Sequence, residues 1–107
     1  MHIQSLTSSI LSANGFTLNL ARASLKKGED EIHLTPKECK LLALLIQNAG
    51  RVVTRKQLMK HVWDTEYLGD TRTLDVHICW LRQKVEENPK LPEYIITKRG
   101  QGYQLRV

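Results

Sequence analysis

The stretch from Asp70 to Val85 constrains the fold of this chain more than any other. Its apolar residues recur at intervals of four, three and four positions: Leu74, Ile78, Leu81 and Val85. That spacing aligns them along one side of a helix. Asp70 or Thr71 can cap the start, and neither glycine nor proline follows inside the stretch. The sequence therefore predicts an amphipathic helix over about 71–87, whose apolar side is covered by other elements.

The opposite side of this predicted helix combines a cation, a hydroxyl, a β-branched apolar residue, an indole and an amide: Arg72, Thr73, Val76, Trp80 and Gln83. A surface helix normally turns plain charged residues to water. A mixed set of this kind can contact phosphates and base edges together. We interpret the stretch as a DNA recognition helix. The alternative at Arg72, Arg82 and Lys84 is a merely solvated face.

The composition is that of an ordinary globular domain, with 107 residues, 41% of them hydrophobic and 25% charged. The formal net charge is +5, and residues 51–107 hold eleven of the sixteen Lys and Arg. Such an excess is compatible with a polyanionic partner, although many small basic proteins bind no nucleic acid.

Two cysteines, Cys39 and Cys79, cannot form a disulfide framework, and reduced thiols are expected. The sequence has no apolar run near the roughly 20 residues that span a bilayer, and it does not open with a signal-peptide pattern. We therefore expect a soluble cytoplasmic protein without membrane association.

The N-terminal third is built from short segments. Residues 1–9 are rich in Ser and Thr and are interpreted as a tail or linker remnant. Residues 16–20 alternate apolar and polar side chains, as a half-buried strand does. Residues 23–26 and 31–34 flank a turn that contains Gly28 and predict a hairpin. This region is interpreted as a small antiparallel sheet that covers a core and does not bind a partner.

Two capping boxes predict two further helices. Thr35 with Glu38, and Pro36 at the first helical position, begin one that ends near Gly50. Its apolar run, residues 41–46, identifies it as the central core element. Thr54 with Gln57 begins the other, which runs through Trp63.

A loop over 64–70 precedes the recognition helix, and prolines at 89 and 92 follow it. Residues 95–98 and 103–107 then predict a β-hairpin with a glycine-rich tip that carries Arg99. Gly100 and Gly102 are expected to be turn residues with positive φ.

At four places the sequence resembles the OmpR/PhoB-type effector domain of bacterial two-component response regulators. These blocks are Leu34-Thr-Pro-Lys-Glu38, Val53-Thr-Arg55, Arg72-Thr-Leu-Asp-Val-His-Ile78 and Ile96-Thr-Lys-Arg-Gly-Gln-Gly-Tyr103. Their order and spacing make the match specific over nearly the whole chain. The resemblance implies an α+β winged helix-turn-helix over 10–107. Its parts are an N-terminal four-stranded antiparallel sheet, a three-helix core and a C-terminal β-hairpin wing.

The resemblance further implies transcription regulation at the end of a phosphorelay, by sequence-specific binding of tandem protomers to direct repeats in double-stranded promoter DNA. Family contacts in the major groove correspond to Arg72, Thr73, Asp75, Val76, His77, Cys79, Trp80 and Arg82. The family's wing residue at the minor groove corresponds to Arg99, and its phosphate contacts correspond to Trp63, Thr97 and Tyr103. The loop through which some members contact RNA polymerase corresponds to Asp64, Glu66, Tyr67 and Asp70. Such domains normally follow a receiver domain, which this chain does not contain.

Two positions depart from the family pattern. Cys79 and Trp80 stand where relatives often have basic residues that donate to base edges. A thiol and an indole cannot read guanine as a bidentate arginine does. Trp80 can instead pack on a thymine methyl group or along sugar edges, so the base preference stays open.

Other site residues have structural readings. Asp75 can cap its helix or pair with a cation, and His77 is expected to be packed or to face a phosphate. Trp63 and Tyr103 can be core aromatics that offer only an N–H or O–H outward.

Neither an enzyme nor a cofactor or metal site is expected, because no acid–base pair and no phosphate-binding glycine loop is present. The scattered His and Cys residues lack the spacing of metal ligands. The alternative function is a winged helix that docks a protein and does not read DNA.

Overall fold

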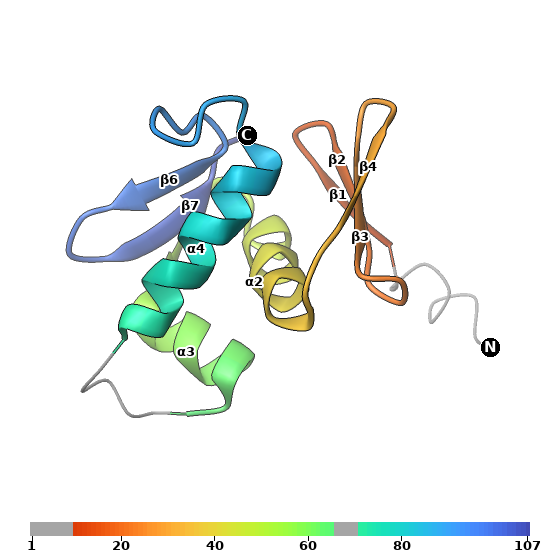
Figure 1. The fold of residues 1–107 in the computed structure, drawn as a ribbon. Coiled ribbons are helices and arrows are strands. Elements are labelled where there is room, and N and C mark those ends of the chain that lie inside the picture. Colours follow the sequence, from red (N-terminus) through yellow and green to blue (C-terminus); the bar gives the residue numbers. More distant parts are fainter. Residues whose placement is uncertain (1–9, 66–70) are drawn as a thin grey trace.

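The computed structural model describes residues 10–65 and 71–107 (Figure 1). The predicted tail over 1–9 and the predicted polymerase-contact residues Glu66, Tyr67 and Asp70 lie outside the described residues. The described elements are an N-terminal sheet, three helices and a second sheet that ends in a hairpin. This is the predicted winged helix, in the predicted order.

The N-terminal sheet consists of β1 (Ile10–Ala13), β2 (Phe16–Asn19), β3 (Ser24–Lys27) and β4 (Asp30–His33), antiparallel and in that order. Asn14 and Gly15 both have positive φ, as a tight two-residue hairpin turn requires. The second predicted hairpin is present but shifted. Lys27 pairs with Asp30, so only two residues form the turn and the strands extend further toward it than predicted.

Helix α2 (Pro36–Gln47) is the centre of the core. It contacts β1, α3, α4 and β7, and in Figure 1 it lies between the N-terminal sheet and the rest of the molecule. The predicted capping box is present, because the Thr35 side chain accepts from the Glu38 N–H and the Glu38 carboxylate accepts from the Thr35 N–H. Leu41, Leu42 and Leu45 are fully buried.

Glu38 is itself buried and forms an ion pair with Lys84 of α4. Burial opposes ionisation of Glu38, but the hydrogen bonds from Lys84 and Thr35 outweigh it and lower the pKa of the carboxyl. The alternative of a merely solvated face therefore does not hold for Lys84. Its ammonium group joins α4 to α2, while the side chain is only partly buried.

Strand β5 (Val52–Thr54) precedes α3 (Arg55–Trp63), which begins with the second predicted capping box. The sequence reading did not include β5, because three residues are too few to show an alternating pattern. It pairs with β7 (Gly102–Leu105), which pairs in turn with β6 (Ile95–Lys98). The predicted hairpin is therefore part of a three-stranded sheet.

The two glycines of the hairpin have different roles. Gly100 has a φ of 75°, as predicted for a turn. The same prediction was wrong for Gly102, which is buried in β7 opposite β5. A Cβ at this position would lie 2.0 Å from the carbonyl oxygen of Val53. Glycine is required at this position because two backbones approach closely, and not because the chain turns there.

Helix α4 (Arg72–Val85) buries the predicted stripe of Leu74, Ile78, Leu81 and Val85. It ends two residues earlier than predicted, at Val85 rather than near 87. The next residue, Glu86, is buried, and its carboxylate accepts hydrogen bonds from the backbone N–H groups of Glu93, Tyr94 and Ile95. This carboxylate holds the connection between α4 and β6. Among the described residues, every helix is too short or too polar to cross a membrane.

Candidate nucleic-acid interface

Helix α4 turns one side outward over its whole length. The exposed residues of that side are Arg72, Thr73, Val76, Cys79, Trp80 and Gln83. They lie opposite the buried stripe, since both sets repeat with the helical period. All of the outward residues predicted to touch DNA are therefore accessible together. Asp75 and Arg82 lie on one flank of this face, and His77 lies on the other.

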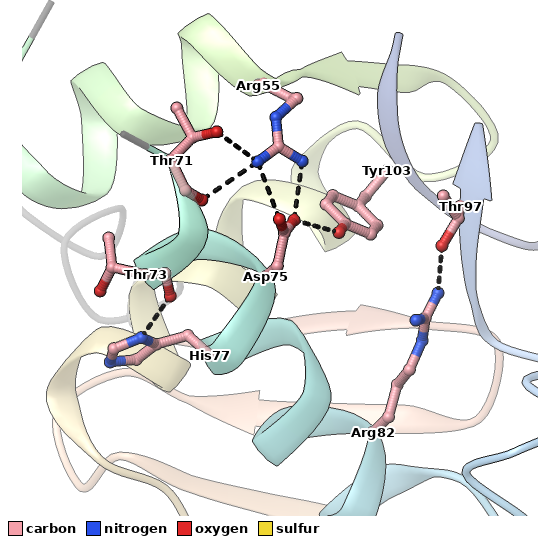
Figure 2. A network of polar contacts seen from close by, with 8 residues as sticks. All are labelled: Arg55, Thr71, Thr73, Asp75, His77, Arg82, Thr97 and Tyr103. Carbon is pink, nitrogen blue, oxygen red and sulfur yellow. Dashed lines mark hydrogen bonds and ion pairs between the residues drawn. The ribbon is translucent and has the colours of Figure 1, made fainter. Parts of the chain in front are cut away.

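The Asp75 flank faces the N-terminus of α3 and strand β7 (Figure 2). Arg55 donates from Nη1 to Asp75 Oδ1 over 2.7 Å and from Nη2 to Oδ2 over 3.1 Å. The Tyr103 hydroxyl donates to the same Oδ1 over 2.7 Å. Arg55 Nη2 also donates to the carbonyl and hydroxyl oxygens of Thr71. These contacts connect the first turn of α4 to α3 and to the second sheet.

The charges of this network are set by its hydrogen bonds. Partial burial opposes ionisation of Asp75, but the hydrogen bonds from Arg55 and Tyr103 prevail and lower the pKa of its carboxyl. Burial and the hydrogen bond to Asp75 raise the pKa of the Tyr103 hydroxyl. Asp75 is thus an anion with a paired charge and Tyr103 a neutral donor. This agrees with the structural reading of Asp75.

Arg82 lies between α4 and the wing. Its Nε and Nη2 donate to the Ile95 carbonyl over 3.1 and 2.8 Å, and Nη2 donates to the Thr97 hydroxyl over 2.8 Å. Its guanidinium carbon is 5.7 Å from the centroid of the Tyr103 ring. Arg82 is therefore half-buried, and Figure 2 shows it extended toward Thr97. These bonds fix the wing relative to α4.

His77 lies on the other flank, between two indoles. Its ring centroid is 5.0 Å from that of Trp63 on α3 and 4.9 Å from that of Trp80. Its Nδ1 is 2.8 Å from the Thr73 carbonyl oxygen. A carbonyl only accepts, so Nδ1 carries a proton and donates. The three rings form a row across α3 and α4, and the packed reading of His77 is confirmed.

The wing tip is basic and exposed. Lys98 and Arg99 are both exposed, next to the Gly100 turn. Thr97 is exposed as well, one residue further from the tip. On α3, Lys56 and Lys60 are exposed, whereas Arg55 is held by Asp75. The cations that surround α4 therefore come from several elements.

The sequence analysis does not predict the roles of two residues that shape this surface. These residues are Arg55, which pairs with Asp75, and Glu86, which binds the backbone of the connection to β6. The partner of Arg55 lies twenty residues away on α4. The partners of Glu86 lie about eight residues away, across an irregular connection. No periodicity reports such pairs, although a lone acid on an otherwise basic helix, Asp75, is a signal that a cation lies nearby. Within residues 10–65 and 71–107, no group of three or more His, Cys, Asp or Glu side chains is placed to hold a metal ion.

Comparison with known proteins places the chain in a family. The family model described as "Transcriptional regulatory protein, C terminal" matches residues 28–105. The alkaline phosphatase synthesis transcriptional regulatory protein SphR of Synechococcus elongatus is 40% identical over 99 residues, which cover 92% of this chain and 38% of SphR. The sensory transduction protein RegX3 of Mycolicibacterium smegmatis is 44% identical over 96 residues, 90% of this chain and 42% of RegX3.

A solved structure has the same architecture. The RstA DNA-binding domain of Klebsiella pneumoniae, determined in complex with the RstA box, aligns with a TM-score of 0.82 and 28% identity. The alignment covers 91% of this chain and 96% of that one. This chain thus spans less than half the length of the curated regulators that it matches, but nearly all of an isolated DNA-binding domain. It belongs to the C-terminal domain family of transcriptional regulatory proteins, the OmpR/PhoB-type winged helices of response regulators.

Proposed function

We propose that this chain binds double-stranded promoter DNA, with α4 in the major groove and the Arg99 tip of the wing at the minor groove. One observation carries the proposal. The outward face of α4 has no acidic residue, and the single acid of the helix, Asp75, is neutralised by Arg55. A phosphate backbone can approach such a face without meeting an unpaired negative charge. The similar RstA DNA-binding domain was determined in complex with the RstA box, which supports DNA binding by a domain of this fold.

The contacts divide into two classes. We assign Arg72, Arg82 and Thr97, with the indole N–H of Trp63, to the phosphate backbone. Tyr103 donates its only hydroxyl proton to Asp75, so we assign it to positioning Asp75 and not to a phosphate. The base-edge contacts are assigned to Thr73, Val76, His77, Cys79 and Trp80. His77 is the least exposed member of the base-edge class, and its Nδ1 proton is donated to Thr73, so it contributes only Nε2.

Further parts of the proposal rest on the family. We infer that protomers bind in tandem to direct repeats, that a receiver domain belongs to the same phosphorelay, and that the protein acts in the cytoplasm. Asp64 ends α3 in a left-handed conformation and begins the loop proposed to contact RNA polymerase.

Selection of bound sequences from a random duplex library tests the proposed function. We expect one enriched motif, present as a direct repeat. The logarithm of affinity for that motif should fall with the logarithm of salt concentration, by about 0.9 for each phosphate neutralised. A library without enrichment, together with a protein partner whose binding does not depend on salt, would support the docking module instead.

Replacing Arg99 by alanine should reduce the preference for A·T base pairs that flank the motif. A narrow A·T-rich minor groove has the most negative potential and attracts an inserted guanidinium group. The measurement compares affinities for duplexes with A·T-rich and G·C-rich flanks. Arg106→Ala is the matched control, because it removes the same charge at the opposite end of β7. Equal loss of preference in both variants would show that net charge, not the wing tip, is responsible.

A further inference from the structure

The outward face of α4 has an apolar centre. Val76 and Trp80 are 43% and 47% exposed, although both are large hydrophobic residues. They stand four positions apart on one helix, so their side chains are neighbours on the same face. The other large exposed hydrophobic residues of the described chain, Ile10, Leu91 and Val107, lie outside α4. Adjacent exposed apolar side chains on a functional surface indicate an apolar partner.

The Trp80 indole is supported from one side. The His77 ring packs against it with an interplanar angle of 56°, and the Trp63 ring packs edge-on against His77. The His77 ring is held in turn by its hydrogen bond to the Thr73 carbonyl. Contacts of this kind favour one orientation of a surface indole over the several that an isolated side chain samples. Trp80 is thus presented with part of its ring packed and the rest exposed.

The polar groups beside Trp80 are poor readers of guanine. Arg82, the arginine nearest to Trp80 in the helix, donates to the Ile95 carbonyl and the Thr97 hydroxyl and points along the wing. Cys79, which follows Val76 by three positions on the exposed side, offers a thiol, which is a weak donor. Bidentate recognition of guanine needs a guanidinium or ammonium group aimed at the base edge. The centre of the face does not supply one.

The major-groove edges of the base pairs carry one apolar group, the C5-methyl of thymine. We propose that Val76 and Trp80 form a methyl-reading pair, which selects thymine at one or two positions of the site by apolar contact. This inference rests on the proposed placement of α4 in the major groove. The surrounding cations of the wing and of α3 match a duplex, whose phosphates flank the methyl groups on both sides.

Replacement of thymine by deoxyuridine tests the pair, because it removes the methyl group and leaves the hydrogen-bonding edge unchanged. The probe is the duplex enriched in the library selection, with each thymine replaced singly. We expect affinity to fall about three- to tenfold at one or two positions and to be unchanged elsewhere. Trp80→Ala and Val76→Ala should each lower affinity for the thymine duplex and reduce the thymine-to-deoxyuridine ratio at those positions toward one. Gln47→Ala, at an exposed glutamine at the end of α2 and outside the outward face of α4, is the control and should keep both the affinity and the ratio.

The outcomes separate the inference from the proposed function. If the wild-type protein binds the enriched motif but tolerates every deoxyuridine, DNA binding stands and methyl reading is wrong. If Trp80→Ala weakens binding to the thymine and deoxyuridine duplexes equally, the indole contacts sugar edges, and methyl reading by the pair is likewise wrong. If no motif is enriched, the proposed function itself fails. The deoxyuridine scan uses only the wild-type protein, so it decides the question even if a variant does not fold.

Discussion

Replacing Leu81 by alanine is expected to lower the free energy of unfolding by about 2–5 kcal/mol. Leu81 is fully buried in the middle of the stripe that α4 turns toward the core. Contacts on both sides of this position oppose a movement of α4 that would fill the space left by the side chain. Lys84 connects it to Glu38 of α2, and Arg82 connects it to β6. The cost of the cavity that remains therefore adds to the hydrophobic free energy lost with the removed side-chain atoms.

Urea unfolding of the two proteins measures this difference. Gln83→Ala is the control, because Gln83 is exposed two residues away on the same helix and should change stability by less than about 0.5 kcal/mol. A similarly small loss for Leu81→Ala would mean that α4 packs through another face.

Replacing Gly102 by alanine is expected to cost about 3 kcal/mol or more, at or above the upper end for overpacking. The added methyl group would lie 2.0 Å from the Val53 carbonyl oxygen and 2.9 Å from the Thr54 Cα. Both are backbone atoms, so no side chain can rotate away. Strand β5 must therefore move away from β7. The start of α3 would move with β5, since Arg55 follows β5 directly.

Gly100→Ala is the matched control for this prediction, two residues away in the same hairpin. Its Cβ would meet nothing within 4 Å, and only its φ of 75° is unfavourable. We expect a loss of about 1 kcal/mol. The two variants are compared by thermal or urea unfolding. If Gly100→Ala were the more damaging, the turn and not the contact between strands would limit the hairpin.

Much of the fold follows from short-range patterns. Both capping boxes lie within four consecutive residues, so Thr35 with Glu38 and Thr54 with Gln57 predicted the starts of α2 and α3 correctly. The buried stripe of α4 repeats with the helical period, and it predicted which side of the helix faces outward. The positive φ of Gly100 follows from its place in a hairpin tip. Each of these features depends on residues that are close in the sequence, and such residues leave a readable pattern.

Other features of the site depend on residues far apart in the sequence. Arg55, Asp75 and Tyr103 meet from α3, α4 and β7, and Lys84 meets Glu38 from a helix 46 residues earlier. Their side chains are ordinary surface types, so neither composition nor periodicity indicates that Arg55 and Lys84 are paired with acids. Only the packing of α4 against α2, α3 and the second sheet decided which charges are paired and which are left for a ligand. The close approach of Val53 to Gly102 is also set by the tertiary structure. It depends on the register between β5 and β7, which neither local sequence shows.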